Sequence, residues 1–377
     1  MKFKSLNHPA LVIAFLAMMS CSAKKEFLYV GTVDQRGSEG IYVYEFNRKD
    51  YEFTKLQTLP EIVSPNFLTL HPSGNFLYAV NNTKDSEGNT INVISSFAIN
   101  KSDGSLSFIN SNPSYGRGAC HVSLDHEGKW AFISHYGSGS LSVFPVGPGG
   151  ETGDSIQTIS YDGRSITSRQ ESSHVHSILV SPDNKFVYLA DLGTDKMMTY
   201  SLDNGTGRLT PAAQAFISLN PGSGPRHFTF HPSKPYIFIA DELSSSVTVV
   251  KTDPSDGSLT KIETLSTLPE NFDKPNSVAD IHTDPDGNFL YVSNRGHNSI
   301  AIYRIQSSGN LEFLAHTDVN GEHPRNFMID PKGEFLIVAN RDTDNVVVFR
   351  LDKKTGLLES KGIELKVPAA LCLKWSI

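Results

Sequence analysis

Histidine, arginine and carboxylate side chains recur beside short apolar segments of this sequence. One set precedes or begins an apolar segment and comprises His121, His174, His176, Arg226, His227, Asp280, His282, His323 and Arg325. A second set follows the next apolar segment and comprises His135, Asp191, Asp241, Glu242, Arg295 and Arg341. Imidazoles and carboxylates transfer protons and guanidinium groups stabilise anions, so together these residues could open an ester or bind a small acidic molecule.

Any one of these residues could instead serve only the fold, because buried polar groups often satisfy one another and nearby backbone amides. We favour this structural interpretation for His135, Asp191 and His227. For the group as a whole we favour a binding site, because an inert scaffold more often places Gly, Ser or Thr at such positions. Three further histidines lie in turns between apolar segments, and we interpret them as turn-forming residues: His71, His126 and His231.

One phrase recurs along the chain and predicts the elements that position these residues. It consists of alternating apolar residues, a turn such as HPSG or DPDG, and a second apolar run such as FLYVSN. Its turns are separated by steps of 54, 56, 50, 53 and 46 residues, and its copies occupy residues 66–82, 119–135, 176–191, 226–241, 280–294 and 326–340. Alternation with a period of two, bounded by Gly, Pro and Asp, is typical of β-hairpins.

Each copy continues into a third alternating run, such as SVTVVKT at residues 246–252, and a weaker fourth run. Four antiparallel strands per repeat predict the blades of a β-propeller. The end of the chain, PAALCLKW (368–375), matches a first strand, whereas EFLYVGT (26–32) and GIYVYEF (40–46) match second and third strands. We therefore expect an all-β fold in which residues 26–377 form one seven-bladed propeller, closed by pairing of the N- and C-terminal strands in one blade.

Residues 1–21 differ from the rest of the chain. Lys2 and Lys4 precede an apolar run at residues 10–19, which ends in Ser20 and Cys21. This pattern is typical of a signal peptide, and the run is too short to span a bilayer, which takes about 20 helical residues. It resembles a bacterial lipoprotein signal, with an ordinary cleaved signal as the alternative. We therefore expect an exported protein, periplasmic or at the outer membrane, that touches the membrane only through a lipid on Cys21.

Charge and cysteine content narrow the possible partners. The 377 residues include 33 Lys and Arg against 40 Asp and Glu, a net charge of −7, without a basic run. We therefore expect no nucleic-acid partner. Cys120 and Cys372 lie in apolar runs and have no CxxC neighbour, so we interpret them as buried small hydrophobic residues rather than as a disulfide or a metal pair.

The chain resembles the family of seven-bladed β-propeller lactonases, which includes propeller-type 6-phosphogluconolactonases and carboxy-cis,cis-muconate cyclases. The resemblance extends over the mature chain and is carried by GPRHFTFHP (224–232), ADELSSSV (240–247), ADIHTDPDGNFLYVSNR (279–295), HVHSILVSPD (174–183) and HPRNFMIDPKGEFLIVAN (323–340). It implies four catalytic residues: His176, Arg226, Glu242 and Arg295. Four residues close to these phrases are second-rank substrate-binding candidates: His174, Asp280, His282 and Arg325.

The resemblance implies a hydrolase that opens a small sugar or sugar-acid lactone by general acid/base chemistry, without a metal or cofactor. Glu242 or His176 would activate water, Arg226 would stabilise the oxyanion, and Arg295 would hold a phosphate or carboxylate of the substrate. The export signal favours an unphosphorylated lactone, because phosphorylated sugar lactones are cytosolic intermediates. Two alternatives stay open: a non-catalytic propeller that binds a glycan or protein, and a cyclase that forms a lactone from a muconate-like diacid.

Overall fold

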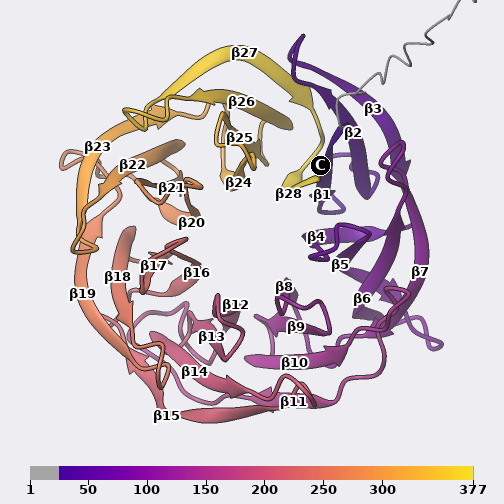
Figure 1. The fold of residues 1–377 in the computed structure, drawn as a ribbon, viewed down its shortest axis with the longest axis horizontal. Helices are drawn as coiled ribbons and strands as arrows, with labels where there is room; N and C mark the ends of the chain where they lie inside the picture. Colours follow the sequence, from indigo (N-terminus) through magenta and orange to yellow (C-terminus); the bar gives the residue numbers. More distant parts are fainter. Residues whose placement is uncertain (1–24, 377) are drawn as a thin grey trace, which may run out of the picture.

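Short alternating apolar segments form strands throughout the described chain. The structure is a computed structural model that describes residues 25–376, so the expected signal peptide with Cys21 lies outside the described residues. Seven antiparallel sheets of four strands each, β1 to β28, surround a central axis (Figure 1). No helix in residues 25–376 is long and apolar enough to cross a membrane. The expected all-β seven-bladed architecture is confirmed.

Six blades are each built from consecutive strands, ordered from an inner strand at the axis to an outer strand at the rim (Figure 1). The first three comprise β4 (Val63–Leu70), β5 (Phe76–Lys84), β6 (Thr90–Ile99) and β7 (Leu106–Pro113); β8 (Ala119–Leu124), β9 (Trp130–His135), β10 (Ser140–Pro145) and β11 (Gln157–Ser160); and β12 (Val175–Val180), β13 (Phe186–Asp191), β14 (Lys196–Leu202) and β15 (Leu209–Ser218). The next three comprise β16 (Pro225–Phe230), β17 (Tyr236–Asp241), β18 (Ser246–Thr252) and β19 (Leu259–Ser266); β20 (Ser277–Thr283), β21 (Phe289–Arg295), β22 (Ser299–Ile305) and β23 (Leu311–Asp318); and β24 (Pro324–Ile329), β25 (Phe335–Asn340), β26 (Asn345–Leu351) and β27 (Leu358–Lys366).

The seventh blade combines both ends of the chain. It comprises β28 (Ala370–Ser376), β1 (Glu26–Thr32), β2 (Ile41–Asn47) and β3 (Glu52–Leu59), and β28 pairs antiparallel with β1. An ionic cluster holds this blade to its neighbour, because Arg48 Nη2 lies 2.7 Å from both Glu26 and Asp330. Trp375 Nε1 also donates a hydrogen bond to Glu26 at 3.2 Å. The expected closure of the ring by the terminal strands is confirmed.

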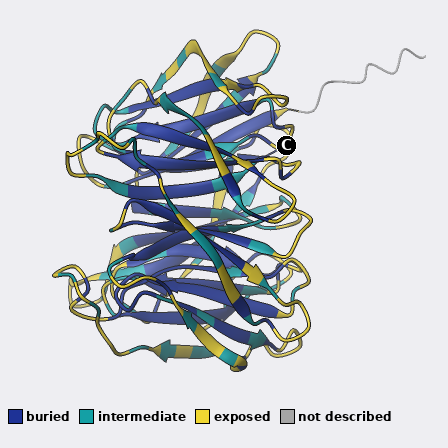
Figure 2. Cartoon of the chain, turned by 90° about the vertical axis from the view of Figure 1, so that its left-hand side faces the viewer, coloured by how far each residue is buried: buried dark blue, intermediate teal, exposed yellow. Residues whose placement is uncertain are grey.

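Apolar side chains and a recurring turn join neighbouring blades. Strands near the axis, such as β1 and β21, are buried along their length, whereas outer strands such as β3 expose many side chains. Figure 2 shows this contrast from the side of the ring, with mainly buried strands inside and exposed residues on the outer strands and loops. The hydroxyl of Tyr188 donates a hydrogen bond at 3.1 Å to the carbonyl of Gly257, in the last turn of the next blade. Gly257 has φ of +75°, and a Cβ there would overlap the ring of Phe186. The turn therefore needs glycine both for its backbone angle and for close packing.

Candidate active site

A β-bulge near the start of every inner strand determines which side chains face the axis. In all seven blades the register between the inner and second strands shifts there, so the inner strand carries extra residues. In β12, Val175 lies opposite Asp191 and Ser177 opposite Ala190, which leaves His176 unpaired. A bulge of this kind re-aims a side chain, and here it directs one side chain of each blade toward the axis.

Two successive residues of each inner strand form two layers around the axis. The upper layer comprises Asn66, Cys120, His176, Arg226, Ala279, Arg325 and Leu371. The lower layer comprises the residues that follow them, Phe67, His121, Ser177, His227, Asp280, Asn326 and Cys372. Contacts between blades that are not neighbours, such as the Phe67 and His227 rings at 5.6 Å, place the lower layer across the axis.

Glu242 is the centre of an arginine cluster beside the upper layer. It directly follows β17, and its Oε2 lies 3.1 Å from Nε of Arg226 in β16. The same oxygen lies 3.0 Å from Nη2 of Arg295, the last residue of β21. The other carboxylate oxygen, Oε1, accepts a hydrogen bond of 2.9 Å from Arg169 Nη2. One buried carboxylate therefore holds three guanidinium groups from three different segments.

These arginines determine the protonation of Glu242. Burial by itself raises the pKa of this carboxyl, but the charges of Arg295, Arg226 and Arg169 outweigh burial and leave the pKa at about 2. Burial and the charges of Arg295 and Arg325 lower the pKa of Arg226 to about 9, which keeps Arg226 protonated at neutral pH. Glu242 is thus an anion with three cationic partners, which makes it a weak proton acceptor.

A recess opens at the mouth of the ring above these residues. Its wider part has a volume of about 750 Å³, and an adjoining part of about 210 Å³ reaches Phe67 and His227 of the lower layer. Glu242 is the one carboxylate among its described lining residues, against five arginines: Arg169, Arg226, Arg295, Arg325 and Arg341. The guanidinium group of Arg325 makes no hydrogen bond or ion pair with the described residues. A separate hollow of about 920 Å³ lies beside the turn between β26 and β27, and no residue of either layer lines it.

Two residues of the site lie outside the repeated strands. Arg169 comes from the long connection between β11 and β12, and its Nη2 also donates to the hydroxyl of Tyr136 at 3.1 Å. The neighbouring Gln170 anchors this connection, donating to the carbonyl of Leu192 at 2.8 Å and to Asp195 Oδ1 at 2.7 Å. Sequence analysis missed both Arg169 and Tyr136. Arg169 occupies no position that recurs from blade to blade. Tyr136 directly follows β9, as Glu242 directly follows β17, and was missed because only charged and imidazole side chains were considered at that position.

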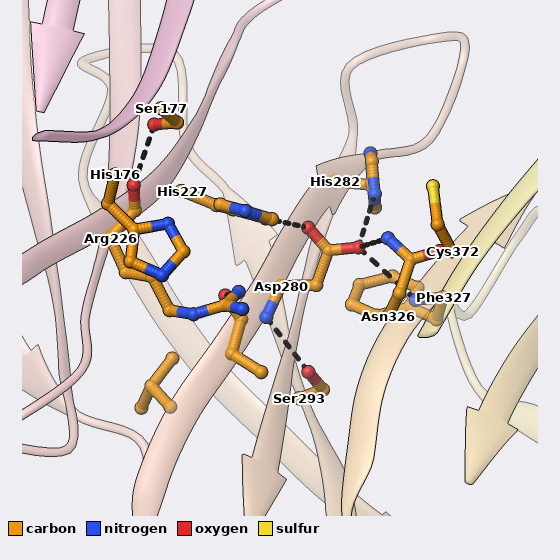
Figure 3. Close-up of polar contacts among 12 residues, drawn as sticks. His176, Ser177, Arg226, His227, Asp280, His282, Ser293, Asn326, Phe327 and Cys372 are labelled. Atoms are coloured by element: carbon orange, nitrogen blue, oxygen red, sulfur yellow. Dashed lines mark hydrogen bonds and ion pairs between the residues drawn. The ribbon is translucent and has the colours of Figure 1, made fainter. Parts of the chain in front are cut away.

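Asp280 organises the lower layer (Figure 3). Its Oδ1 lies 2.7 Å from His227 Nδ1, and its Oδ2 lies 3.0 Å from His282 Nε2. Oδ2 also accepts hydrogen bonds from the side chain of Asn326 and, at 3.2 Å, from the backbone nitrogen of Phe327. Burial raises the pKa of Asp280, but His282 and His227 outweigh it and hold the pKa well below its usual value. Asp280 is therefore a buried anion surrounded by donors.

The predicted site residues fall into two groups. Four catalytic candidates and one second-rank candidate line the recess together: His176, Arg226, Glu242, Arg295 and Arg325. Three second-rank candidates do not line it: His174, Asp280 and His282. His174 stacks on Tyr136 with ring centroids 4.3 Å apart and bonds its carbonyl at 2.9 Å, so it supports the wall of the recess from behind.

Four further residues test the structural interpretations. The Asp191 carboxylate accepts hydrogen bonds from Ser173, Thr194 and two backbone amides, which is a purely structural environment. For His227 the expectation of a purely structural role does not cover what the structure shows, because its ring lines the recess as well as hydrogen-bonding to Asp280. Cys372 is buried as expected, but the expectation was wrong for Cys120, which is only partly buried and lines the recess.

The position of Cys120 has a physical reason and a signal in the sequence. It lies at the bulge, five residues before the turn residue Asp125, as His176 lies five residues before Ser181. Alignment of the repeats on their turns therefore identifies the upper layer. Within residues 25–376 no group of three or more His, Cys, Asp or Glu side chains is arranged to hold a metal ion.

Comparison with known proteins agrees with this architecture. The family described as "Lactonase, 7-bladed beta-propeller" matches residues 27–375. A 6-phosphogluconolactonase of Formosa agariphila is 37% identical over 354 residues, covering 92% of this chain and 98% of that protein. The 6-phosphogluconolactonase of Bacillus subtilis is 34% identical over 348 residues, covering 92% and 97%. The solved structure of the periplasmic gluconolactonase of Pseudomonas aeruginosa has a TM-score of 0.87 at 30% identity and covers 94% of this chain and 99% of that one. With the fold and the recess at its mouth, these matches show that the chain belongs to the family of seven-bladed β-propeller lactonases.

Proposed function

We propose that the protein hydrolyses small sugar or sugar-acid lactones in the recess at the mouth of the ring. The observation that carries this proposal is the excess of arginines over carboxylates among the described lining residues, where the guanidinium group of Arg325 has no ion-pair partner in residues 25–376. Such a site suits a substrate that bears an anionic group and develops an oxyanion during the reaction. The names of the relatives, 6-phosphogluconolactonase and gluconolactonase, support a lactone as the substrate.

His176 is the general base in this proposal. It lines the wider part of the recess, and burial together with the charge of Arg226 lowers its pKa well below the usual value, so its imidazole is neutral. His176 removes a proton from water while the hydroxyl oxygen bonds to the lactone carbonyl carbon. When the ring C–O bond breaks, the leaving alkoxide takes that proton from His176. Glu242 orients the arginines and does not accept the proton, because its charge is already shared by three of them.

The arginines divide the remaining work. Arg226 and Arg295 are fixed by Glu242, and Arg295 Nη2 also donates to the carbonyl of Val278 at 2.8 Å. Arg226 stabilises the developing oxyanion, as a preorganised charge that needs no rearrangement during the reaction. The unpaired Arg325, together with Arg295, binds the carboxylate or phosphate of the substrate.

Hydrolysis assays with three lactones test this proposal. Gluconolactone, 6-phosphogluconolactone and a muconolactone are incubated with the protein, and ring opening is followed against the spontaneous rate. We expect turnover of a sugar lactone, with a lower KM for the phosphorylated form because Arg325 binds the anion. No turnover above the spontaneous rate for all three would contradict the proposal and favour a binding propeller. Activity confined to the muconolactone, in either direction, would favour a cyclase.

We also propose that the protein is exported and anchored by a lipid on Cys21. The periplasmic location in the name of the Pseudomonas aeruginosa gluconolactonase supports export. Mass spectrometry of the mature N-terminus tests the anchor, because lipidation adds acyl chains to Cys21 and Cys21→Ala abolishes them. A mature chain that begins elsewhere, or an unmodified Cys21, would contradict it.

A further inference from the structure

The lower layer contains a buried carboxylate and imidazole in the arrangement that fixes a histidine tautomer. Asp280 and His227 are 3% and 6% exposed, and Asp280 Oδ1 lies 2.7 Å from His227 Nδ1. Burial and the charge of Arg226 lower the pKa of His227 to about 4, so its ring carries a single proton at neutral pH. The ionised Asp280 only accepts hydrogen bonds, so this proton resides on Nδ1 of His227. Nε2 of His227 consequently presents a lone pair.

The nitrogen that carries this lone pair, His227 Nε2, lies beside His176, the proposed base, and has no hydrogen-bond partner in the described residues. His227 Nε2 is buried and makes no hydrogen bond with residues 25–376, and the same holds for His176 Nδ1. The two rings pack against each other with centroids 5.3 Å apart and an interplanar angle of 76°. Figure 3 shows His227 between Asp280 on one side and His176 on the other. The two unsatisfied ring nitrogens therefore belong to neighbouring imidazoles, one an acceptor and the other able to donate.

We propose that Asp280 and His227 are positioning residues that act through His176, an inference that rests on the proposed role of His176 as base. Asp280 holds the proton of His227 on Nδ1. The rings of His227 and His176 are in contact but not hydrogen-bonded in this structure; in the relay a small rotation of the rings lets His227 Nε2 accept the Nδ1 proton of His176. His176 then presents Nε2 as a lone pair to the recess. When Nε2 takes a proton from water, the Nδ1 proton of His176 moves onto His227 Nε2, and the resulting imidazolium is paired with Asp280. The proton returns by the same route when the alkoxide leaves, so the cycle balances without a further reagent.

Among the groups of residues 25–376 that act most strongly on the two imidazoles, Asp280 is the anion placed to stabilise this imidazolium. His176 faces Arg226 and His227 from β16, Arg295 from β21 and Arg325 from β24, and its ring also contacts Tyr136. These arginines disfavour a protonated His176. His227 faces Arg226 and His282, which disfavour its protonation, and Asp280, which favours it. The ring of His227 also contacts the ring of His121. Moving the proton toward Asp280 therefore moves positive charge away from the arginine cluster.

Asp280→Asn and His227→Gln test the relay in steady-state assays with the sugar lactone that the wild type turns over. Either variant keeps a polar side chain of similar size and removes the charge or the second protonation site. We expect kcat to fall about tenfold or more while KM stays within about twofold. The loss of the anion makes a protonated His176 less stable, so the acid limb of the kcat/KM profile should move to lower pH by about half a unit or more.

Ser293→Ala is the matched control, because Ser293 Oγ accepts a hydrogen bond from the Asp280 backbone nitrogen at 2.9 Å and donates none to the Asp280 carboxylate. It disturbs the same strand but should leave both kcat and the acid limb unchanged. The relay is overturned if both test variants keep kcat within twofold of the wild type. It is also overturned if kcat falls while the acid limb stays in place, or if Ser293→Ala produces the same loss. If the wild type turned over none of the lactones, the proposed function would be contradicted, and the relay, which rests on that function, would be contradicted with it.

A second measurement does not depend on activity. Nitrogen-15 chemical shifts of the imidazoles in the full protein report which ring nitrogen carries the proton. We expect the Nδ1-protonated tautomer for both His227 and His176, and a change of tautomer population at His176 in Asp280→Asn. Circular dichroism shows whether each variant is folded before its spectrum is interpreted. An Nε2-protonated His227 in the wild type would overturn the relay whatever the kinetics.

Discussion

Replacing Glu242 with glutamine separates its electrostatic role from a role as proton acceptor. Glutamine keeps the shape of the side chain and removes the charge that Arg169, Arg226 and Arg295 share at 2.9 to 3.1 Å. The side chains of Arg226 and Arg295 are only 3% and 7% exposed, so water cannot replace the lost anion. We therefore expect Glu242→Gln to be clearly less stable than the wild type at neutral pH.

The pKa of Glu242 gives the size of this effect. A fall from 4.5 to about 2, at about 1.4 kcal/mol per unit, corresponds to about 3 kcal/mol of stabilisation. Because the folded-state pKa is depressed, this stabilisation is fully present above pH 4.5 and is lost as the pH falls through about 2. We expect Glu242→Gln to lower Tm by about 5 °C at pH 7 and by roughly half as much at pH 3.

Thermal unfolding followed by circular dichroism at the two pH values measures the difference. Glu334→Gln is the control, because Glu334 also pairs with an arginine, Arg48, but its side chain is 46% exposed. We expect that control to lose less than about 1 kcal/mol. Equal losses in the two variants would refute the reasoning from burial. A Glu242→Gln protein of normal stability without turnover would show that the carboxylate acts in proton transfer rather than as an anchor for arginines.

Four further changes have defined outcomes. Arg226→Ala should lower kcat/KM for the preferred sugar lactone at least tenfold, about 1.4 kcal/mol, in steady-state assays, and near-normal activity would contradict its role. Arg325→Gln should raise KM severalfold for 6-phosphogluconolactone but not for neutral gluconolactone, whereas equal effects would contradict an anion site. Asp241→Asn should raise Tm, and by more at pH 8 than at pH 4. Burial raises the pKa of Asp241 to about 7 in the folded state, so the stability that its proton confers on the folded protein is lost as the pH rises through that value. A gain in Tm that does not depend on pH would contradict this cause. Deletion of residues 368–377, which include β28, should strongly lower Tm, and an unchanged Tm would mean that the ring does not need its closing strand.

The fold was predictable because each blade repeats the same local pattern. Apolar alternation with a period of two and turns such as DPDG fixed the type of each strand, and repetition fixed the number of blades. The same regularity predicted that the start of an inner strand and the end of a second strand lie on one face. The ion pair between Arg226 and Glu242, at 3.1 Å, follows directly from that geometry.

The rest of the site could not be predicted, because it depends on irregular features. Alternation with a period of two does not reveal a bulge, so by itself it assigned Cys120 to the core; only alignment of the repeats on their turns identifies Cys120 as an upper-layer residue. Arg169 lies in a connection without a counterpart in other blades, and its position depends on hydrogen bonds of Gln170 to a distant segment. His227 and Asp280 are 53 positions apart, one repeat step, so the repeat places them at equivalent positions of neighbouring blades; that their side chains face each other depends on the bulges, which periodicity does not reveal.

The pairing of β28 with β1 has a consequence for biosynthesis. Of the described strands, β1 is among the first to leave the ribosome and β28 is the last, so the nascent ring is an arc with unsatisfied edges until β28 has been synthesised. Exposed strand edges of this kind recruit other chains, and such distant pairing forms slowly. A fragment that lacks β28 should accordingly accept the missing strand as a separate peptide, which would make the protein divisible into two parts that reassemble.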